Sequence, residues 1–127
     1  MAQILLVEPD TVLAKTYAAA LQARGHHLLR AQDAQSAINA TDTVRPDCII
    51  LELRLPRHNG VEFLYELRSH ADWQDIPVII LSQLSLDRAG LDETKMSELG
   101  VRAFCYKPDT NLLTLTTMVE DIVQVSA

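Results

Sequence analysis

Four polar residues stand at the ends of apolar runs in the sequence, and together they could form a charged site. Glu8 and Glu52 supply two carboxylates, Ser82 supplies a hydroxyl, and Lys107 supplies an ammonium group. Two carboxylates could bind a divalent cation such as Mg²⁺, or they could form an internal ion pair with the lysine. The residue types favour the ion pair, because a hard cation requires several well-placed oxygen ligands.

The apolar runs before these residues are short and nearly continuous. Such a run, without the alternation of a half-exposed strand, indicates a strand that is buried on both faces. We predict strands at residues 4–7, 48–51, 77–81 and 101–106, and a shorter, more exposed strand at residues 27–30.

Segments with helical spacing of apolar residues separate these strands. Asp10 or Thr11 can cap the first helix, which should end at Gly25. Further helices are expected to begin near Asp33, Asn59 and Asp109, and one should end at Gly100 after a polar stretch of residues 83–90. Strands that alternate with helices in this way form a parallel sheet that is covered on both faces.

The order of the elements determines where the polar residues lie. Ligands of open parallel sheets bind beyond the carboxyl ends of the strands. Glu8, Glu52, Ser82 and Lys107 each end a strand, so we expect them to meet at this one edge of the sheet.

The composition is that of one acidic domain over residues 1–127. Hydrophobic residues make up 48% and charged residues 22%, which excludes wholesale disorder. No apolar run approaches the roughly 20 residues of a membrane span, and the start of the chain does not resemble a secretory signal. A net charge of −6 disfavours nucleic-acid binding by this domain. Cys48 and Cys105 lie in apolar runs and are expected to be buried free thiols of a cytoplasmic protein.

The order and spacing of these segments resemble the receiver domains of bacterial two-component response regulators, of the single-domain chemotaxis-regulator type. The resemblance covers the whole chain and rests on residues 4–8, 46–56, 59–60, 76–82 and 100–108. It implies an α/β, flavodoxin-like, doubly wound sheet of five parallel strands in the order 2-1-3-4-5, flanked by five helices.

The resemblance also implies a chemistry for the strand ends. In that family, an aspartate after the third strand accepts a phosphoryl group from a histidine kinase, and two acidic residues after the first strand help to hold Mg²⁺. A hydroxyl and a lysine bind the phosphoryl oxygens. These two roles fall to Ser82 and Lys107, and the aromatic residue that reports the switch is Phe104, for which a packing role in the core is favoured. A cis peptide bond is implied before Pro108.

Two positions depart from the family pattern. The phosphoacceptor position holds Glu52, whose carboxylate lies one methylene farther out than that of aspartate, and a misplacement of about 1 Å can cost about 100-fold in rate. The second acidic position is Pro9, which has no side-chain oxygen. Asp10 follows one residue too late, and its expected role is to cap the first helix. Poor binding of a cation would also leave the transferring phosphoryl group poorly neutralised.

We therefore expect no useful phosphorylation, no enzymatic activity and no cofactor. Mg²⁺ would bind only if the metal site survives, with Glu8 and Glu52 as its candidate ligands beside Asp10 in the acidic pocket. The main hypothesis is a pseudo-receiver that acts by binding other signalling proteins. Glu52 then either mimics the phosphorylated state together with Lys107 or only neutralises the pocket.

The residues leave two alternatives to this hypothesis. One is a working response regulator, in which Asp10 or Glu8 holds Mg²⁺ through water and Glu52 is a slow phosphoryl acceptor. The other, a flavin or nucleotide binder, is disfavoured because no Gly-rich loop follows the first strand.

The resemblance places partner binding on the face made by the fourth helix, fifth strand and fifth helix. A homodimer is one candidate for an assembly through this face. Residues 83–90, beside it, make the chain a few residues longer than typical receivers. We expect no contact with nucleic acid or a membrane.

Overall fold

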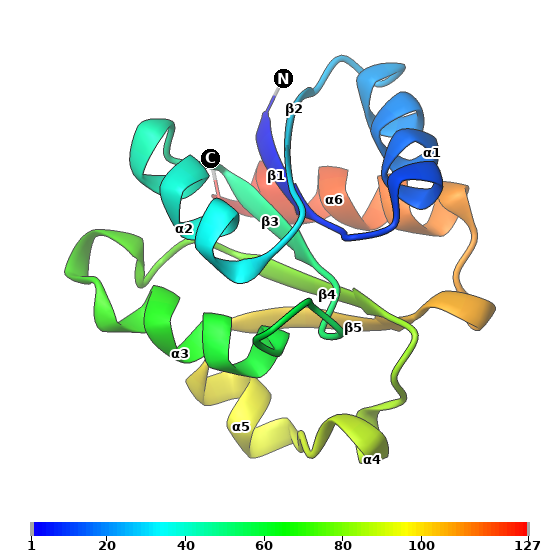
Figure 1. Cartoon of the computed structure of the whole chain (residues 1–127). Helices are drawn as coiled ribbons and strands as arrows, with labels where there is room; N and C mark the ends of the chain where they lie inside the picture. Colours follow the sequence, from blue (N-terminus) through cyan, green and yellow to red (C-terminus); the bar gives the residue numbers. More distant parts are fainter. Residues whose placement is uncertain (1, 127) are drawn as a thin grey trace.

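Five parallel strands form the centre of the computed structural model, which describes residues 2–126 (Figure 1). Their order is β2-β1-β3-β4-β5, so the predicted doubly wound sheet is confirmed. The strands are β1 (Gln3–Val7), β2 (His27–Ala31), β3 (Cys48–Leu51), β4 (Val78–Ser82) and β5 (Val101–Tyr106).

The burial of each strand follows from its place in the sheet. Every side chain of β3 and β4, near the middle, is buried, and these two strands consist almost wholly of apolar residues. The edge strand β2 is mostly exposed, as the sequence predicts. Ser82 is therefore a buried hydroxyl at the end of a fully buried strand.

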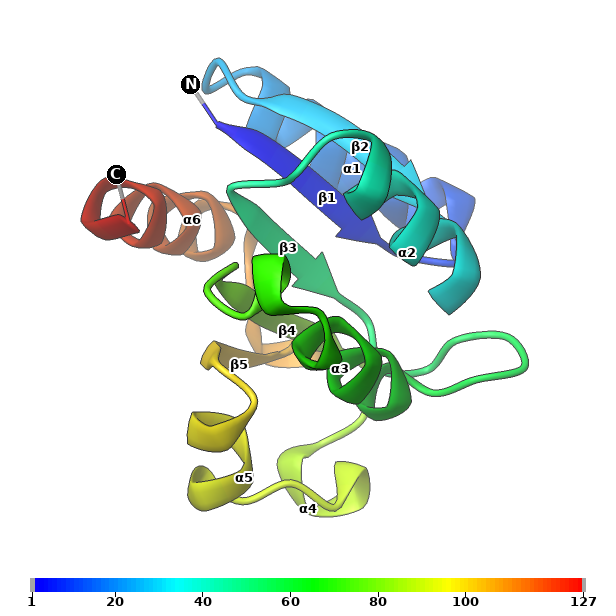
Figure 2. The ribbon, with the colours of Figure 1, turned by 90° about the vertical axis from the view of Figure 1, so that its left-hand side faces the viewer.

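Helices cover both faces of the sheet, with α1 and α6 on one face and α2, α3 and α5 on the other (Figures 1 and 2). A separate apolar core lies under each set of helices. The helices are α1 (Thr11–Gln22), α2 (Ala34–Thr43), α3 (Gly60–Ser69), α4 (Leu86–Ala89), α5 (Glu93–Glu98) and α6 (Leu112–Ser126), and two 3₁₀ turns span Ala71–Trp73 and Lys107–Asp109.

Side-chain caps fix where the first three helices begin. Asp10 accepts from the Leu13 backbone N–H at 2.9 Å, and Asp33 caps α2 in the same way. Asn59 and Glu62 form a full capping box at the start of α3. These caps confirm the predicted starts of the helices.

The helix predicted to end at Gly100 is α5, and a further short helix, α4, lies within the polar stretch of residues 83–90. After α4 the backbone of Gly90 adopts the left-handed conformation, with φ of 70°, which ends the helix. Leu91 then packs into the core, and Asp92 caps α5. The described residues therefore contain six α-helices in place of five, because the four residues of α4 are too few to show a helical pattern within the polar stretch.

Arg68 joins α3 to the turn before β5. Its guanidinium donates to the carbonyl oxygens of Leu99 and Ile76 at 2.7 Å and of Trp73 at 2.8 Å. Gly100 lies against the same group, because a Cβ there would be 2.7 Å from Arg68 Nη2. With a further bond to the Gly100 carbonyl oxygen at 3.3 Å, one half-buried arginine thus donates to four backbone carbonyls.

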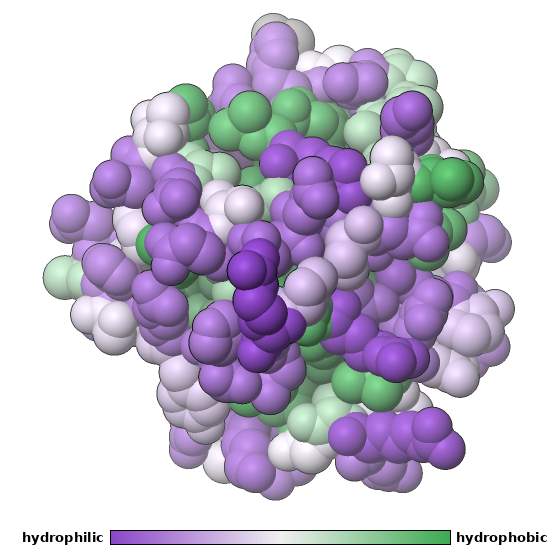
Figure 3. Space-filling model, in the orientation of Figure 1, coloured by the Kyte–Doolittle hydropathy of each residue, from purple (hydrophilic) through white to green (hydrophobic). Residues whose placement is uncertain are grey.

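Hydrophilic side chains cover most of the face in Figure 3, and hydrophobic ones appear there in separate patches. Cys48 and Cys105 are buried free thiols, and burial raises the pKa of Cys48 to about 12. No helix of the described residues is long and apolar enough to cross a membrane.

Candidate functional site

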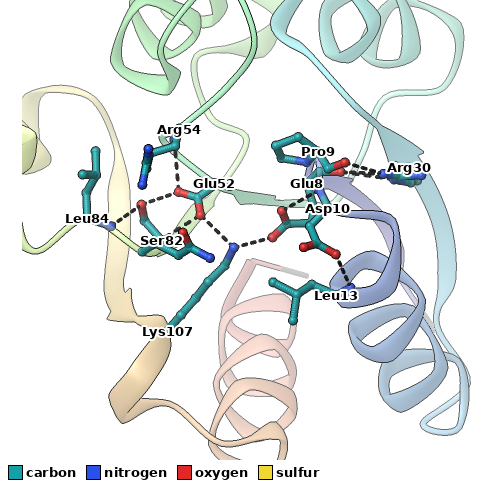
Figure 4. A network of polar contacts seen from close by, with 11 residues as sticks. Glu8, Pro9, Asp10, Leu13, Arg30, Glu52, Arg54, Ser82, Leu84 and Lys107 are labelled. Carbon is teal, nitrogen blue, oxygen red and sulfur yellow. Dashed lines mark hydrogen bonds and ion pairs between the residues drawn. The ribbon is translucent and has the colours of Figure 1, made fainter.

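The four strand-end residues meet at the carboxyl edge of the sheet (Figure 4). The ammonium of Lys107 lies 2.6 Å from Glu8 Oε1 and 2.7 Å from Glu52 Oε1. The Ser82 hydroxyl donates to Glu52 Oε2. The side chains of Glu8, Glu52 and Lys107 are only 3%, 2% and 9% exposed. The arrangement is a buried ion-pair cluster with one ammonium between two carboxylates.

Glu52 is held by donors at both of its carboxylate oxygens. Oε1 accepts from Lys107 and from the Gln83 backbone N–H at 3.1 Å. Oε2 accepts from Ser82 and from the Arg54 backbone N–H at 3.1 Å. Each oxygen thus accepts two hydrogen bonds, and the carboxylate is fixed in one orientation.

Glu8 has a donor at each oxygen as well. Its Oε1 faces Lys107, and its Oε2 accepts from the Asp10 backbone N–H at 3.1 Å. The Asp10 carboxylate is exposed and caps α1, so this residue contributes its backbone N–H to the acidic pocket and not its side chain.

Arg30 is a contributor that the sequence analysis did not identify. Its guanidinium donates to the Glu8 carbonyl oxygen at 3.0 and 3.1 Å and to the Pro9 carbonyl oxygen at 3.1 Å. Arg30 lies on β2, where it pairs in register with Leu6 of β1. That register, which depends on the pairing of two strands, is the only signal that could have revealed the contact.

The hydrogen bonds outweigh the effect of burial on the ionisation of the pair. Burial alone would raise the pKa of Glu52, but the bonds from Lys107, Ser82 and the Arg54 N–H hold it below its ordinary value. Burial alone would lower the pKa of Lys107, but the bonds to Glu52 and Glu8 hold it above its ordinary value. Both groups are therefore charged at neutral pH.

The remaining residues named by the resemblance lie beside the cluster. Phe104 is half-buried and packs against the core under α2 and α3, in agreement with the packing role favoured for it. The implied cis bond before Pro108 is wrong for this structure, in which all described peptide bonds are trans. A 3₁₀ turn begins at Lys107, closed by the Thr110 N–H onto its carbonyl oxygen at 3.2 Å, and the fixed φ of proline suits the start of a helical turn.

The loop between β3 and α3 begins next to Glu52 and ends close to Leu53, the residue after it. The Gly60 N–H donates to the Leu53 carbonyl oxygen at 2.8 Å. A Cβ on Gly60 would lie 2.8 Å from Leu53 Cα, so only glycine allows α3 to start this close to β3. Both ends of the loop, residues 54–59, are therefore fixed next to the cluster.

The oxygen atoms of this site are not a suitable set of ligands for the Mg²⁺ that the resemblance implies. All four carboxylate oxygens of Glu8 and Glu52 already accept hydrogen bonds, and the Pro9 carbonyl oxygen accepts from Arg30. A hard cation needs several free oxygens. Within the described part of the chain, no three His, Cys, Asp or Glu side chains are placed to hold a metal ion together.

Comparison with known proteins assigns the family of this site. The family model of the response regulator receiver domain matches residues 4–120. The chain belongs to this family. The receiver domain is 32% identical, over 108 residues, to the KDP operon transcriptional regulatory protein KdpE of Escherichia coli K12, covering 85% of this chain and 45% of that protein. It is 28% identical to the phosphate regulon transcriptional regulatory protein PhoB of the same strain, covering 84% and 45%. The chain thus spans less than half the length of these relatives.

Solved structures agree with the assignment. The signal receiver domain of a signal transduction histidine kinase from Syntrophus aciditrophicus has a TM-score of 0.85 at 26% identity, covering 98% of this chain and 92% of that one. The chemotaxis response regulator CheY4 of Vibrio cholerae has a TM-score of 0.83 at 23% identity, covering 96% and 98%, which shows the shared fold.

Proposed function

We propose that this receiver domain acts by binding other signalling proteins, without accepting a phosphoryl group and without enzymatic activity. The observation that carries the proposal is the state of Glu52, whose two oxygens each accept two hydrogen bonds. In-line attack on phosphorus needs a carboxylate oxygen that is free to approach it. Freeing either oxygen would leave buried donors without a partner, which costs about 1–3 kcal/mol for each.

The proposal includes an active-like role for Glu52. The resemblance assigns the Ser82 hydroxyl and the Lys107 ammonium to phosphoryl oxygens, and here both bind the Glu52 carboxylate. Glu52 also binds the Gln83 N–H, and the Ser82 hydroxyl oxygen accepts from the Leu84 N–H at 3.1 Å. The segment after β4 is thereby tied to the buried carboxylate. We propose that this tie holds the segment in one conformation.

The surface formed by β5 and α6 suits a protein partner. Leu113 is 67% exposed on α6, and Tyr106 and Leu112 are also exposed. A groove of about 560 Å³ lies between β5 and α6, with Leu113, Met118 and Ile122 among its lining residues. We propose that a signalling protein, or a second copy of the domain, binds at this face, which the fourth-helix region, β5 and α6 form together.

Intact-mass measurement after incubation with acetyl phosphate and Mg²⁺ tests the absence of phosphorylation. Wild type, Glu52→Asp and Glu66→Asp are compared, where Glu66 is an exposed glutamate far from the strand ends in sequence. Wild type and Glu66→Asp should gain no mass. Glu52→Asp should gain the mass of one phosphoryl group if the shorter carboxylate alone restores the acceptor.

A further variant separates the two departures from the family pattern. If Glu52→Asp also stays unmodified, Glu52→Asp combined with Pro9→Asp should become phosphorylated, because it restores both an acceptor and a metal ligand. A stoichiometric gain of one phosphoryl group by the wild-type protein would overturn the proposal. That result would restore the alternative, a phosphoryl-accepting response regulator.

A further inference from the structure

Lys107 reaches across the end of a strand to contact two others. The sheet order places β4 between β3 and β5, with β1 beyond β3. Lys107 follows β5, yet its ammonium lies 2.7 Å from Glu52 after β3 and 2.6 Å from Glu8 after β1. One buried positive charge therefore links the ends of three strands.

The ammonium lies where a bridging cation would have to lie. A divalent metal shared by Glu8 and Glu52 would need the facing oxygens of both carboxylates, and these are the two Oε1 atoms that Lys107 contacts. For the metal to enter, the lysine would have to leave a position in which it is 9% exposed and doubly paired. Removing one partner from a buried ion pair leaves an uncompensated charge, which is strongly unfavourable.

Further donors bind the carboxylates and two backbone carbonyl oxygens of the pocket. Backbone N–H groups of Asp10, Arg54 and Gln83 bind the carboxylates, and Arg30 binds the carbonyl oxygens of Glu8 and Pro9. Two carboxylates against one ammonium leave a net charge of −1, which these dipoles and the Ser82 hydroxyl stabilise. Each carboxylate is therefore paired with the lysine and hydrogen-bonded without any ion from solution.

We infer that Lys107 is the resident cation of this pocket, so that the receiver domain neither needs nor admits a divalent metal there. The inference rests on the proposed function, because a pocket that performs no phosphoryl transfer has no need of a metal. Its consequence concerns regulation. A cation that is part of the chain is present at all times, and the conformation and partner affinity of the domain should be the same in Mg²⁺ and in a chelator.

Thermal unfolding with Mg²⁺ or Mn²⁺ tests the inference, with NaCl at equal ionic strength as the reference. Wild type is compared with Lys107→Met and with Lys95→Met, which removes an exposed lysine. The Tm of wild type and of Lys95→Met should not rise with either metal. The Tm of Lys107→Met should rise, because the two carboxylates lose their cation and can then share the metal.

Two results would overturn the inference. One is a metal-dependent rise of Tm in the wild-type protein. The other is a folded Lys107→Met variant whose Tm does not rise with metal, because the lysine would then not be the group that excludes the metal. If Lys107→Met does not fold, Mn²⁺ broadening of wild-type amide NMR signals decides the question. Selective loss of the Glu8 and Asp10 signals contradicts the inference, and unchanged signals support it.

These measurements are independent of the test of phosphorylation. Metal binding by a wild-type protein that stays unphosphorylated would overturn only the resident-cation inference. Phosphorylation of a wild-type protein with no Tm response to metal would overturn only the proposed function.

Discussion

Lys107 and Glu52 form an ion pair of 2.7 Å although their strands, β5 and β3, are not neighbours in the sheet. The strand between them ends in Ser82, whose small side chain leaves the lysine a path across the sheet edge and also binds Glu52. The pair therefore fixes the spacing of three adjacent strand ends. Replacing either charge should affect the stability of the fold as well as the site.

Glu52→Gln should destabilise the domain. It keeps the size of the side chain but removes the negative charge that Lys107 and Ser82 bind, and breaking a buried ion pair costs about 3 kcal/mol or more. Urea unfolding followed by the fluorescence of Trp73, the single tryptophan, measures the free energy of unfolding. The exposed control Glu66→Gln should stay within about 0.5 kcal/mol of wild type. Equal losses in both variants would show that Glu52 is not specifically stabilised.

The contribution of Glu52 to the free energy of unfolding should fall in acid. Its pKa is held below the ordinary 4.5, so the folded protein keeps the carboxylate ionised at pH values where the unfolded chain binds a proton. The stability gained over Glu52→Gln is thus fully present above pH 4.5 and is lost as the pH falls through the lower folded value.

At high pH the stabilisation by the ion pair is limited by Lys107, which loses its proton there. Its pKa is raised above 10.5, so its share is fully present below that value and is lost as the pH rises through the folded value. Urea unfolding of wild type and Glu52→Gln over a pH series should give a flat difference around neutral pH. A difference that is as large in strong acid as at neutral pH would contradict the assignment.

Arg68→Met should destabilise the domain by about 3 kcal/mol, because each buried carbonyl that loses its donor costs about 1–3 kcal/mol. The variant keeps the apolar stem but leaves the carbonyl oxygens of Leu99, Trp73 and Ile76 without the guanidinium. Arg102→Met, at an exposed position of β5, is the matched control. Urea midpoints that shift equally in the two variants would refute a special role for Arg68.

The two short helices α4 and α5 should be the least protected regular segments. The helices α4 and α5 have 4 and 6 residues, and helices this short have little stability of their own. Amides of residues 86–98 should exchange with deuterium at least about 10-fold faster than that of Val119, which is buried in the middle of α6. Equal protection of both segments would show that packing compensates for the short length.

The sequence predicts the features that depend on local patterns. Apolar runs predict the five strands, cap residues such as Asp10 and Asn59 predict where helices begin, and strand ends predict where Glu8, Glu52, Ser82 and Lys107 lie. The roles of Arg30 and Arg68 depend on carbonyl groups that lie 22 and 31 residues away along the chain. No local pattern marks such a contact, because any exposed arginine has the same sequence signature.

Asp10 is a second example of a contact that the sequence does not predict, because its backbone N–H and not its side chain binds the acidic pocket. Its position one residue after Pro9 indicates a cap, but the spacing alone does not show that its N–H also binds Glu8 Oε2. Likewise, Glu52 is visible in the sequence as a longer acceptor side chain. The Arg54 N–H that binds it lies only two residues farther along the chain, but the Gln83 N–H becomes apparent as a donor only when the segments after β3 and β4 are placed side by side.

The close contact between Gly60 and Leu53 makes the β3–α3 loop a place where the chain could be lengthened. The Gly60 N–H to Leu53 carbonyl bond of 2.8 Å closes the base of the loop, while Arg57 at its tip has a left-handed φ of 68° and an 80% exposed side chain. Exposed loop tips with fixed ends tolerate inserted residues. A short peptide epitope inserted between Arg57 and His58 would therefore be displayed on the loop that follows Glu52, with the cap of α3 and the buried charges left in place.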